Sequence, residues 1–178
     1  MAALTVLAHT ELSSNTANIT HTGLSGSYDH LLLKWSIRDA TSNWYGDSGI
    51  YFNQTANGST YPLSLTKLNA QGSSLTAATN ASSYALFGFH NNGNTSSNNC
   101  FSAGEAWVLN YADTSNKRPI LFDNLVPNDS TSNTSIQMGA GLLGNTANAI
   151  TAVTIFNQSG SQLLTGSSLT VYGINGAS

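Results

Sequence analysis

Charged residues are scarce in this sequence. Five Lys and Arg residues and eight Asp and Glu residues make up 7% of the 178 residues, against roughly 25% in ordinary soluble domains. Few groups are therefore available for acid–base catalysis or metal binding, and solubility must rest on the Ser, Thr and Asn side chains. This composition is typical of an all-β surface scaffold rather than an enzyme, and we expect no cofactor.

The chain also lacks a basic patch and a long apolar run. Its net charge is −3, and its five cations are scattered along the sequence except for one adjacent pair. Binding to the phosphates of a nucleic acid is therefore not expected. No apolar run approaches the roughly 20 residues that a membrane helix needs, and residues 1–11 have no positively charged leader. We expect a protein that is neither exported nor embedded in a membrane.

Sulfur and imidazole groups are few. Cys100 is the single cysteine, which excludes an intrachain disulfide, and we expect it to be a small buried side chain. The four histidines, His9, His21, His30 and His90, are far apart and show no metal-ligand spacing. The sequence therefore predicts no metal site.

Asp29 and His30 are the nearest approach to a catalytic pair. Adjacent residues of a strand point to opposite faces of the sheet, so Asp29 cannot easily orient His30. No Gly-x-Ser-x-Gly motif marks a nucleophile either. We expect no catalytic residue, and we expect His30 to cap or pair a strand end.

Alternation of apolar and polar residues is the strongest structural signal. In residues 29–39, Leu31, Leu33, Trp35 and Ile37 alternate with polar side chains, which predicts a strand with one buried face. Other candidate strands, each flanked by turn-forming residues, are 4–11, 17–22, 49–53, 84–90, 101–111, 119–125, 135–141, 150–156 and 168–174. Residues 61–68 fit either a strand or a single helical turn. About ten short strands predict an antiparallel β-sandwich of jelly-roll type.

One of these strands carries a conflict. In residues 101–111 the apolar set that includes Trp107 and Tyr111 also contains Glu105. A carboxylate on a buried face needs a partner or an exposed strand end. We expect Glu105 to have such a partner or to lie at an interface.

The length fits a single β-sandwich domain over residues 1–178. Within it, residues 1–22 can form an N-terminal arm or strands that contact a neighbouring molecule.

Trp44 and Tyr45 stand together in a polar segment, residues 39–47. Aromatic rings beside amide and carboxylate groups can form a platform for a sugar ligand. Loop aromatics also cap the end of a sandwich or fill a subunit interface, which is the commoner use.

Three segments resemble small virion proteins of tailed bacteriophages, notably those of cyanobacterial and marine phages. The first is GLSGSYDHL at residues 23–31, which contains Tyr28, Asp29 and His30. The second is AITAVTI at residues 149–155, followed by GSSLTVYGI at residues 166–174, which contains Tyr172. Between them, residues 106–111 and 114–118 are similar to the central strand and the turn of that family. The amide-rich segments 46–60 and 91–99 depart from the pattern.

The resemblance implies a structural role in the phage particle and brings no catalytic residues. We expect a capsid decoration (cement) protein on the outer surface of the head, located in the virion and assembled in the host cytoplasm. Its expected partners are the major capsid protein and further copies of itself, as a homotrimer. The alternative is a tail- or fibre-associated module that binds a host glycan through Trp44 and Tyr45.

Overall fold

Twelve β-strands form the described part of the chain, and they belong to two antiparallel sheets. The computed structural model describes residues 4–53, 63–82, 88–95, 100–127, 134–143 and 148–176. The strands are β1 (Leu4–Glu11), β2 (Asn18–Thr22), β3 (His30–Ile37), β4 (Tyr45–Phe52), β5 (Leu63–Gln71), β6 (Ser74–Ser82), β7 (Gly88–Asn92), β8 (Ser102–Leu109), β9 (Arg118–Val126), β10 (Ser135–Leu143), β11 (Ala152–Asn157) and β12 (Ser168–Ile174).

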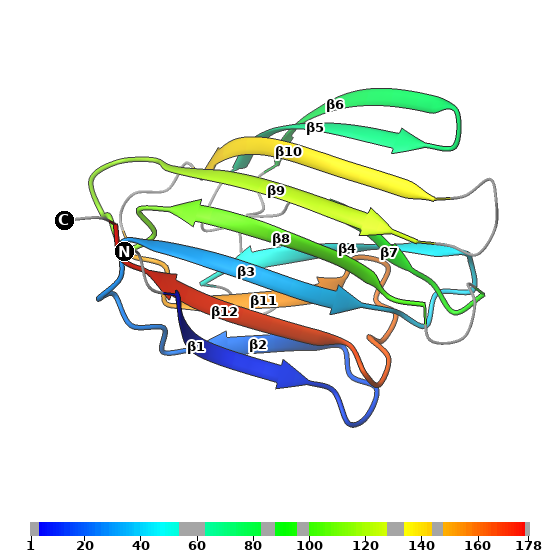
Figure 1. Ribbon diagram of the computed structural model, residues 1–178, viewed down its shortest axis with the longest axis horizontal. Coiled ribbons are helices and arrows are strands. Elements are labelled where there is room, and N and C mark those ends of the chain that lie inside the picture. Colours follow the sequence, from blue (N-terminus) through cyan, green and yellow to red (C-terminus); the bar gives the residue numbers. More distant parts are fainter. Residues whose placement is uncertain are drawn as a thin grey trace.

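Eight of these strands have jelly-roll order. The larger sheet begins β1-β12-β3-β8, and the smaller sheet is β2-β11-β4-β7. Successive strands of this set alternate between the sheets except for β4 and β7, which pair within the smaller sheet, and the first strand pairs with the last. The two sheets lie one behind the other in Figure 1. The expected all-β, jelly-roll sandwich is confirmed.

The larger sheet continues beyond the jelly roll. Strands β9, β10, β5 and β6 extend it past β8, which gives the eight-stranded order β1-β12-β3-β8-β9-β10-β5-β6. β7, the edge strand of the smaller sheet, reaches β8, β9 and β10. β5 and β6 form the far end of the larger sheet in Figure 1, on the far side of β10 from the jelly roll.

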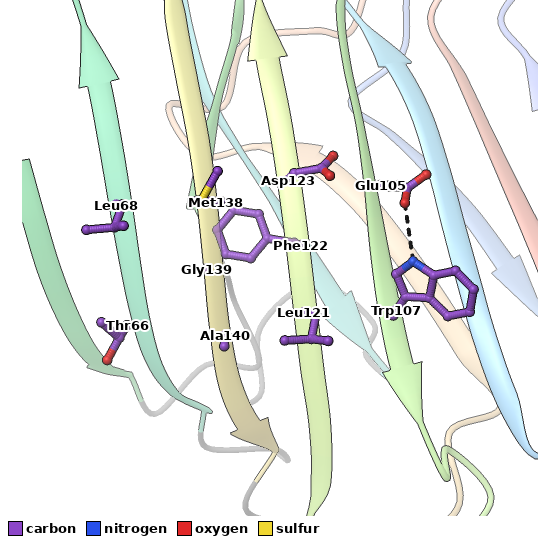
Figure 2. Close-up of a pocket in the computed structure, with 10 residues that line it drawn as sticks. All are labelled: Thr66, Leu68, Glu105, Trp107, Leu121, Phe122, Asp123, Met138, Gly139 and Ala140. Carbon is purple, nitrogen blue, oxygen red and sulfur yellow. Dashed lines mark hydrogen bonds between the residues drawn. The ribbon is translucent and has the colours of Figure 1, made fainter. Parts of the chain in front are cut away.

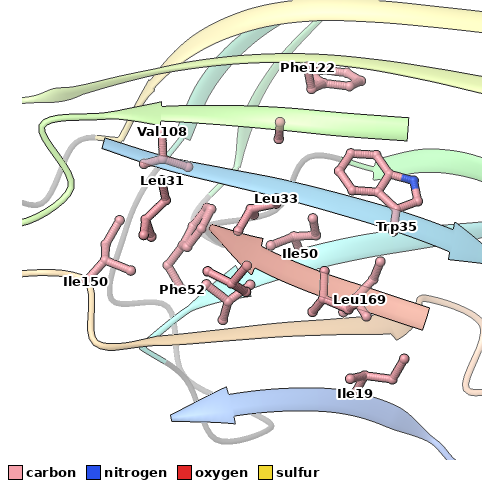
Figure 3. Close-up of a cluster of buried hydrophobic side chains, with 14 of the residues drawn as sticks. Ile19, Leu31, Leu33, Trp35, Ile50, Phe52, Val108, Phe122, Ile150 and Leu169 are labelled. Carbon is pink, nitrogen blue, oxygen red and sulfur yellow. The ribbon is translucent and has the colours of Figure 1, made fainter. Parts of the chain in front are cut away.

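The core lies between the two sheets where they overlap. Leu31, Leu33, Trp35 and Ile37 of β3 are buried there, as the alternation predicts. They meet apolar side chains of other strands and of the segment before β11, of which Figure 3 labels Ile19, Ile50, Phe52, Val108, Phe122, Ile150 and Leu169.

The strand predictions are accurate where apolar alternation is strong. The predicted strands 4–11 and 168–174 coincide with β1 and β12. Residues 61–68 belong to a strand rather than a helical turn from Leu63 onward, and residues 61 and 62 lie outside the described residues. Residues 84–87 of another prediction also lie outside them. β6 was not anticipated, because Ser74–Ser82 contains one large apolar side chain.

The buried face of β8 differs from the expectation. Ala106 and Val108 lie in the core, whereas Glu105 and Trp107 lie on the opposite, outer face of the sheet. The apolar set that includes Trp107 is therefore not the core set of this strand. The smaller residues face inward because the ring of Trp35 lies against Gly104, where an added Cβ would be 2.6 Å from Trp35 Cε2.

Residues 4–22 are part of both sheets. β1 pairs with β12 at the edge of the larger sheet, and β2 pairs with β11 at the edge of the smaller one. Each of these strands keeps one edge unpaired within the described chain, which leaves the expected contact with a neighbouring molecule open as a prediction.

Candidate functional site: an apolar outer face and an aromatic cluster

The outer face of the extended sheet exposes large apolar side chains. In β9 and β10 the alternate residues that point away from the smaller sheet are apolar except for Asp123, although side chains on a solvent-facing sheet surface are normally polar. We call this face the outer apolar surface; its large side chains are Trp107 of β8, Leu121 and Leu125 of β9, Ile136, Met138 and Leu142 of β10, Leu68 of β5 and Leu75 of β6.

Strand register makes this surface continuous. Asp123 pairs with Met138, Met138 with Leu68, and Leu68 with Ala77, so that one row of side chains crosses from β9 to β6. A neighbouring row runs from Leu125 through Ile136 to Leu75. Side chains opposite one another on neighbouring strands lie about 5 Å apart, which is contact distance for residues of this size.

A shallow groove runs through the middle of the surface. Its volume is about 520 Å³, and it is lined by residues of β5, β10, β9 and β8. Figure 2 shows Leu68 and Met138 on one side and Glu105, Trp107 and Asp123 on the other. The groove is therefore apolar, with carboxylates along one margin.

These carboxylates differ in their surroundings. Glu105 forms an ion pair of 3.0 Å with Lys34 and accepts a hydrogen bond of 3.2 Å from the indole nitrogen of Trp107. The hydrogen bond from Lys34 lowers the pKa of Glu105. Burial, reinforced by the charge of Glu105, raises the pKa of Asp123. Glu105 thus has the partner expected for it, and Asp123 is the carboxylate for which ionisation costs more.

Near its turn, the polarity of the β5–β6 hairpin is reversed relative to the sandwich core. Lys67, Asn69 and Thr76 point to the side of the smaller sheet, while Leu68 and Leu75 point outward. A hairpin that packed on the core would bury its apolar side chains there. The pattern shows that the apolar side of this hairpin faces away from the core of its own chain.

Trp44 and Tyr45 belong to a separate aromatic cluster. Tyr45 is the first residue of β4, so the polar segment 39–47 runs into a strand, and the amide-rich segment 46–60 begins within the same strand. The ring centroids of Trp44 and Tyr45 are 4.4 Å apart, and those of Tyr45 and His90 are 4.5 Å apart. Pairing of β4 with β7 brings His90 to this place. The three half-buried side chains form one aromatic row.

Polar groups lie beside this row. His90 Nε2 is 3.6 Å from Asp47 Oδ1, and His90 Nδ1 is 3.4 Å from the hydroxyl of Ser135. Burial lowers the pKa of His90; the Asp47 carboxylate opposes this effect and Lys67 adds to it. Burial also lowers the pKa of Lys67.

This Ser–His–Asp grouping is not arranged for nucleophilic catalysis. The Ser135 hydroxyl donates its proton to Asn69 Oδ1 at 2.8 Å, so His90 must donate to Ser135 and cannot accept that proton. Ser135 is also fully buried. The cluster can bind a polar ligand through its rings and its carboxylate, but it lacks an activated nucleophile.

The other residues considered from the sequence have structural partners. His30 begins β3, and its Nδ1 accepts a hydrogen bond of 3.1 Å from the backbone of Asn110 at the end of β8. Asp29 accepts a hydrogen bond from the backbone of Gly176. The thiol of half-buried Cys100 donates to the carbonyl of Pro127 at 2.8 Å. Of the expected candidates, only Trp44 and Tyr45 are brought together with further functional groups.

Asp47 lies in the segment 39–47 expected to supply polar groups beside the aromatic pair, and it shares β4 with Tyr45. Sequence reasoning missed Lys67 and His90, which come from β5 and β7 and are brought to this place only by strand pairing over long distances in the sequence. Among the described residues, no group of three or more His, Cys, Asp or Glu side chains is placed to hold a metal ion. The same part of the chain contains no helix of the length and hydropathy required to cross a membrane.

Compared with known proteins, the chain matches no family model, no curated protein and no solved structure.

Proposed function

We propose that this chain is a virion structural protein of a tailed bacteriophage that decorates the outer surface of the capsid and bridges subunits of the major capsid protein. The observation that carries the proposal is the outer apolar surface. Side chains as exposed as Met138 (51%) and Leu75 (71%) are grouped on one sheet face. Such a face is typical of a protein that works within an assembly. The resemblance of residues 23–31 and 166–174 to phage virion proteins suggests that this assembly is a phage particle.

The edge of β1 is the element proposed to contact the capsid. β1 is the outermost strand of the larger sheet on the side opposite β6. Leu4 and Val6 on it are 58% and 57% exposed. An open strand edge with apolar side chains can accept a strand of the capsid protein as an additional partner.

Stabilisation of the capsid follows from mass action. A protein that binds only the assembled lattice stabilises that lattice by RT ln(1 + [L]/Kd). Several linked copies bind more tightly than one through their effective concentration, and we propose a homotrimer because capsid lattices contain matching symmetry axes. No chemistry is required of the chain, in keeping with its few ionisable groups.

The proposal is tested on phage particles from which the chain has been removed. Purified chain should cosediment with these particles and raise the temperature at which they release DNA. Cryo-electron microscopy should then show its density at the lattice symmetry axes of the head. Binding should persist at about 0.5 M salt, because apolar contacts are not screened. Density confined to the tail or its fibres would contradict the proposal.

A substitution at the β1 edge tests the proposed contact. Val6→Asp should weaken particle binding at least about tenfold, because a carboxylate then has to be buried at the interface. Thr22→Asp adds the same charge to β2, at an exposed position of the smaller sheet, and serves as the matched control. Equal binding of both variants would refute a role for the β1 edge.

The aromatic row favours a second candidate, a host-glycan-binding module of the tail or its fibres. Trp44, Tyr45 and His90 present adjacent rings, and Asp47 lies within reach as a hydrogen-bond acceptor. Sugars bind such combinations of apolar ring faces and polar groups. Glycan-array binding that is abolished in Trp44→Ala and retained in Trp107→Ala, which removes an indole on the opposite face of the fold, would favour this candidate.

A further inference from the structure

We infer that the outer apolar surface of β8, β9, β10, β5 and β6 is a self-association surface, which binds the same surface of another copy of this chain. This inference deepens the expectation of self-assembly within the proposed function. It concerns a part of the molecule different from the β1 edge. Self-association of the chain can therefore be tested separately from its binding to the capsid.

The first observation concerns the outer side of the β5–β6 hairpin. A sheet face buries its apolar side chains only where another layer packs on it, and among the described strands none packs on the outer side of β5 and β6. Leu75 and Leu68 nevertheless point outward while Lys67 and Thr76 point inward. The hairpin has the pattern of a strand pair whose apolar cover comes from outside its own chain.

The shape of the surface indicates which kind of partner surface fits it. The outer apolar surface is a sheet face, and sheet faces pack on other sheet faces about 10 Å apart with their side chains interleaved. This chain already uses that geometry between its own two sheets. A second copy offers the same face with the same twist and the same apolar side chains, which is the condition for an isologous contact.

The area is sufficient for such a contact. Five strands at about 4.8 Å spacing span about 24 Å, and nine-residue strands at about 3.3 Å per residue span about 30 Å. The face therefore covers about 700 Å², close to the roughly 800 Å² that each partner contributes to a stable interface. Two faces stack directly in an isologous dimer, whereas three faces around one axis would contact one another heterologously in a trimer.

The charges on the surface are compatible with a second copy. Lys34 and Glu105 neutralise one another within each chain at 3.0 Å. The row that runs from Asp123 through Met138 to Leu68 then contains one carboxylate, that of Asp123, and its neighbours in the row are apolar. A basic partner would be expected to face a strongly acidic surface, whereas this surface is nearly neutral, as self-association requires.

The experiment measures the mass of the full chain in solution. Sedimentation equilibrium at micromolar concentration should give two or three times the chain mass of 18.6 kDa. Met138→Asp places a charge at the centre of the surface and should weaken association at least about tenfold. Thr22→Asp is the matched control and should associate as the unmodified chain does.

A second variant keeps the test decisive if Met138→Asp fails to fold. Leu75→Asp lies on the edge strand β6 at 71% exposure, where the folded monomer tolerates a charge. It should also shift the chain toward a monomer while its far-ultraviolet circular dichroism is unchanged. A monomeric unmodified chain, or folded Leu75→Asp that associates as tightly as the unmodified chain, would overturn the inference. Val6→Asp that still self-associates but no longer binds particles separates this surface from the capsid contact.

Discussion

The indole nitrogen of Trp35 donates a hydrogen bond of 3.0 Å to the side-chain oxygen of Asn124. The amide nitrogen of the same Asn124 donates to the backbone carbonyl of His90 at 2.7 Å. One buried amide therefore connects β3 and β9 of the larger sheet to β7 of the smaller sheet. It lies at the point where the jelly roll passes into the four-stranded extension.

Asn124→Leu is expected to lower the free energy of unfolding by about 3 kcal/mol, because it removes the acceptor for a buried indole and the donor to a buried carbonyl. Urea denaturation followed by tryptophan fluorescence measures the change. Asn18→Leu, on the exposed side of β2, is the control and should cost less than about 1 kcal/mol. Equal stability of the two variants would show that the connection contributes little.

Gly139→Ala is expected to destabilise the fold by about 1–3 kcal/mol through overpacking. The ring of Phe122 lies against Gly139, and an added Cβ would also be 2.8 Å from the carbonyl oxygen of Thr66. Gly26→Ala is the control, because a Cβ there would meet only Ala112 Cβ at 3.8 Å. In the double variant with Phe122→Leu the cost should shrink, and an undiminished cost would contradict the ring contact as its cause.

Stability is expected to fall as the pH drops below about 6.5, the ordinary pKa of histidine. Burial lowers the pKa of both His21 and His90 in the folded chain. At pH values between the lowered pKa of the folded chain and the ordinary pKa, the unfolded chain binds more protons than the folded chain. Acid therefore favours unfolding in this pH range, and the effect is absent above the ordinary pKa. Thermal denaturation at about pH 5 and about pH 8 measures the difference. His21→Gln removes one of the two titrating groups and should flatten the dependence. A dependence that is unchanged in this variant would exclude His21 as a source.

Asp123→Asn is expected to tighten self-association about tenfold near neutral pH, because the interface between copies then buries an amide in place of a carboxylate. Burial and the charge of Glu105 already raise the pKa of Asp123. Acidification should therefore strengthen association of the unmodified chain, while the Asn variant should respond less. Sedimentation at two pH values compares them. Weaker association of the variant would indicate that Asp123 has a cationic partner across the interface.

The fold class and most strands could be predicted because they depend on local patterns. In β3 the alternation of Leu31, Leu33, Trp35 and Ile37 with polar residues predicts the buried face directly. β6 escaped detection because Ala, Thr, Ser and Asn give it no apolar alternation, and pairing with β5 holds it in the sheet. The aromatic pair at Trp44 and the nearby Asp47 can be found in the sequence, but the contact with His90 cannot, because it depends on the pairing of β4 with β7.

The alternation of apolar and polar residues, and with it the two-residue period of the strands, follows from the amino-acid sequence, as does the small number of ionisable groups. Which of the two alternating sets lies inside depends on the long-range packing of the sheets. In β8 both sets contain apolar residues, and the close packing of Trp35 on Gly104 selects the smaller one for the core. In β9 apolar side chains lie on both faces, with Phe122 in the core and Leu121 exposed. Met138 of β10, Leu68 of β5 and Leu75 of β6 face outward, where no described strand of the chain covers them. Alternation specifies two faces of a strand, but the layer that lies against each face is a long-range property of the fold.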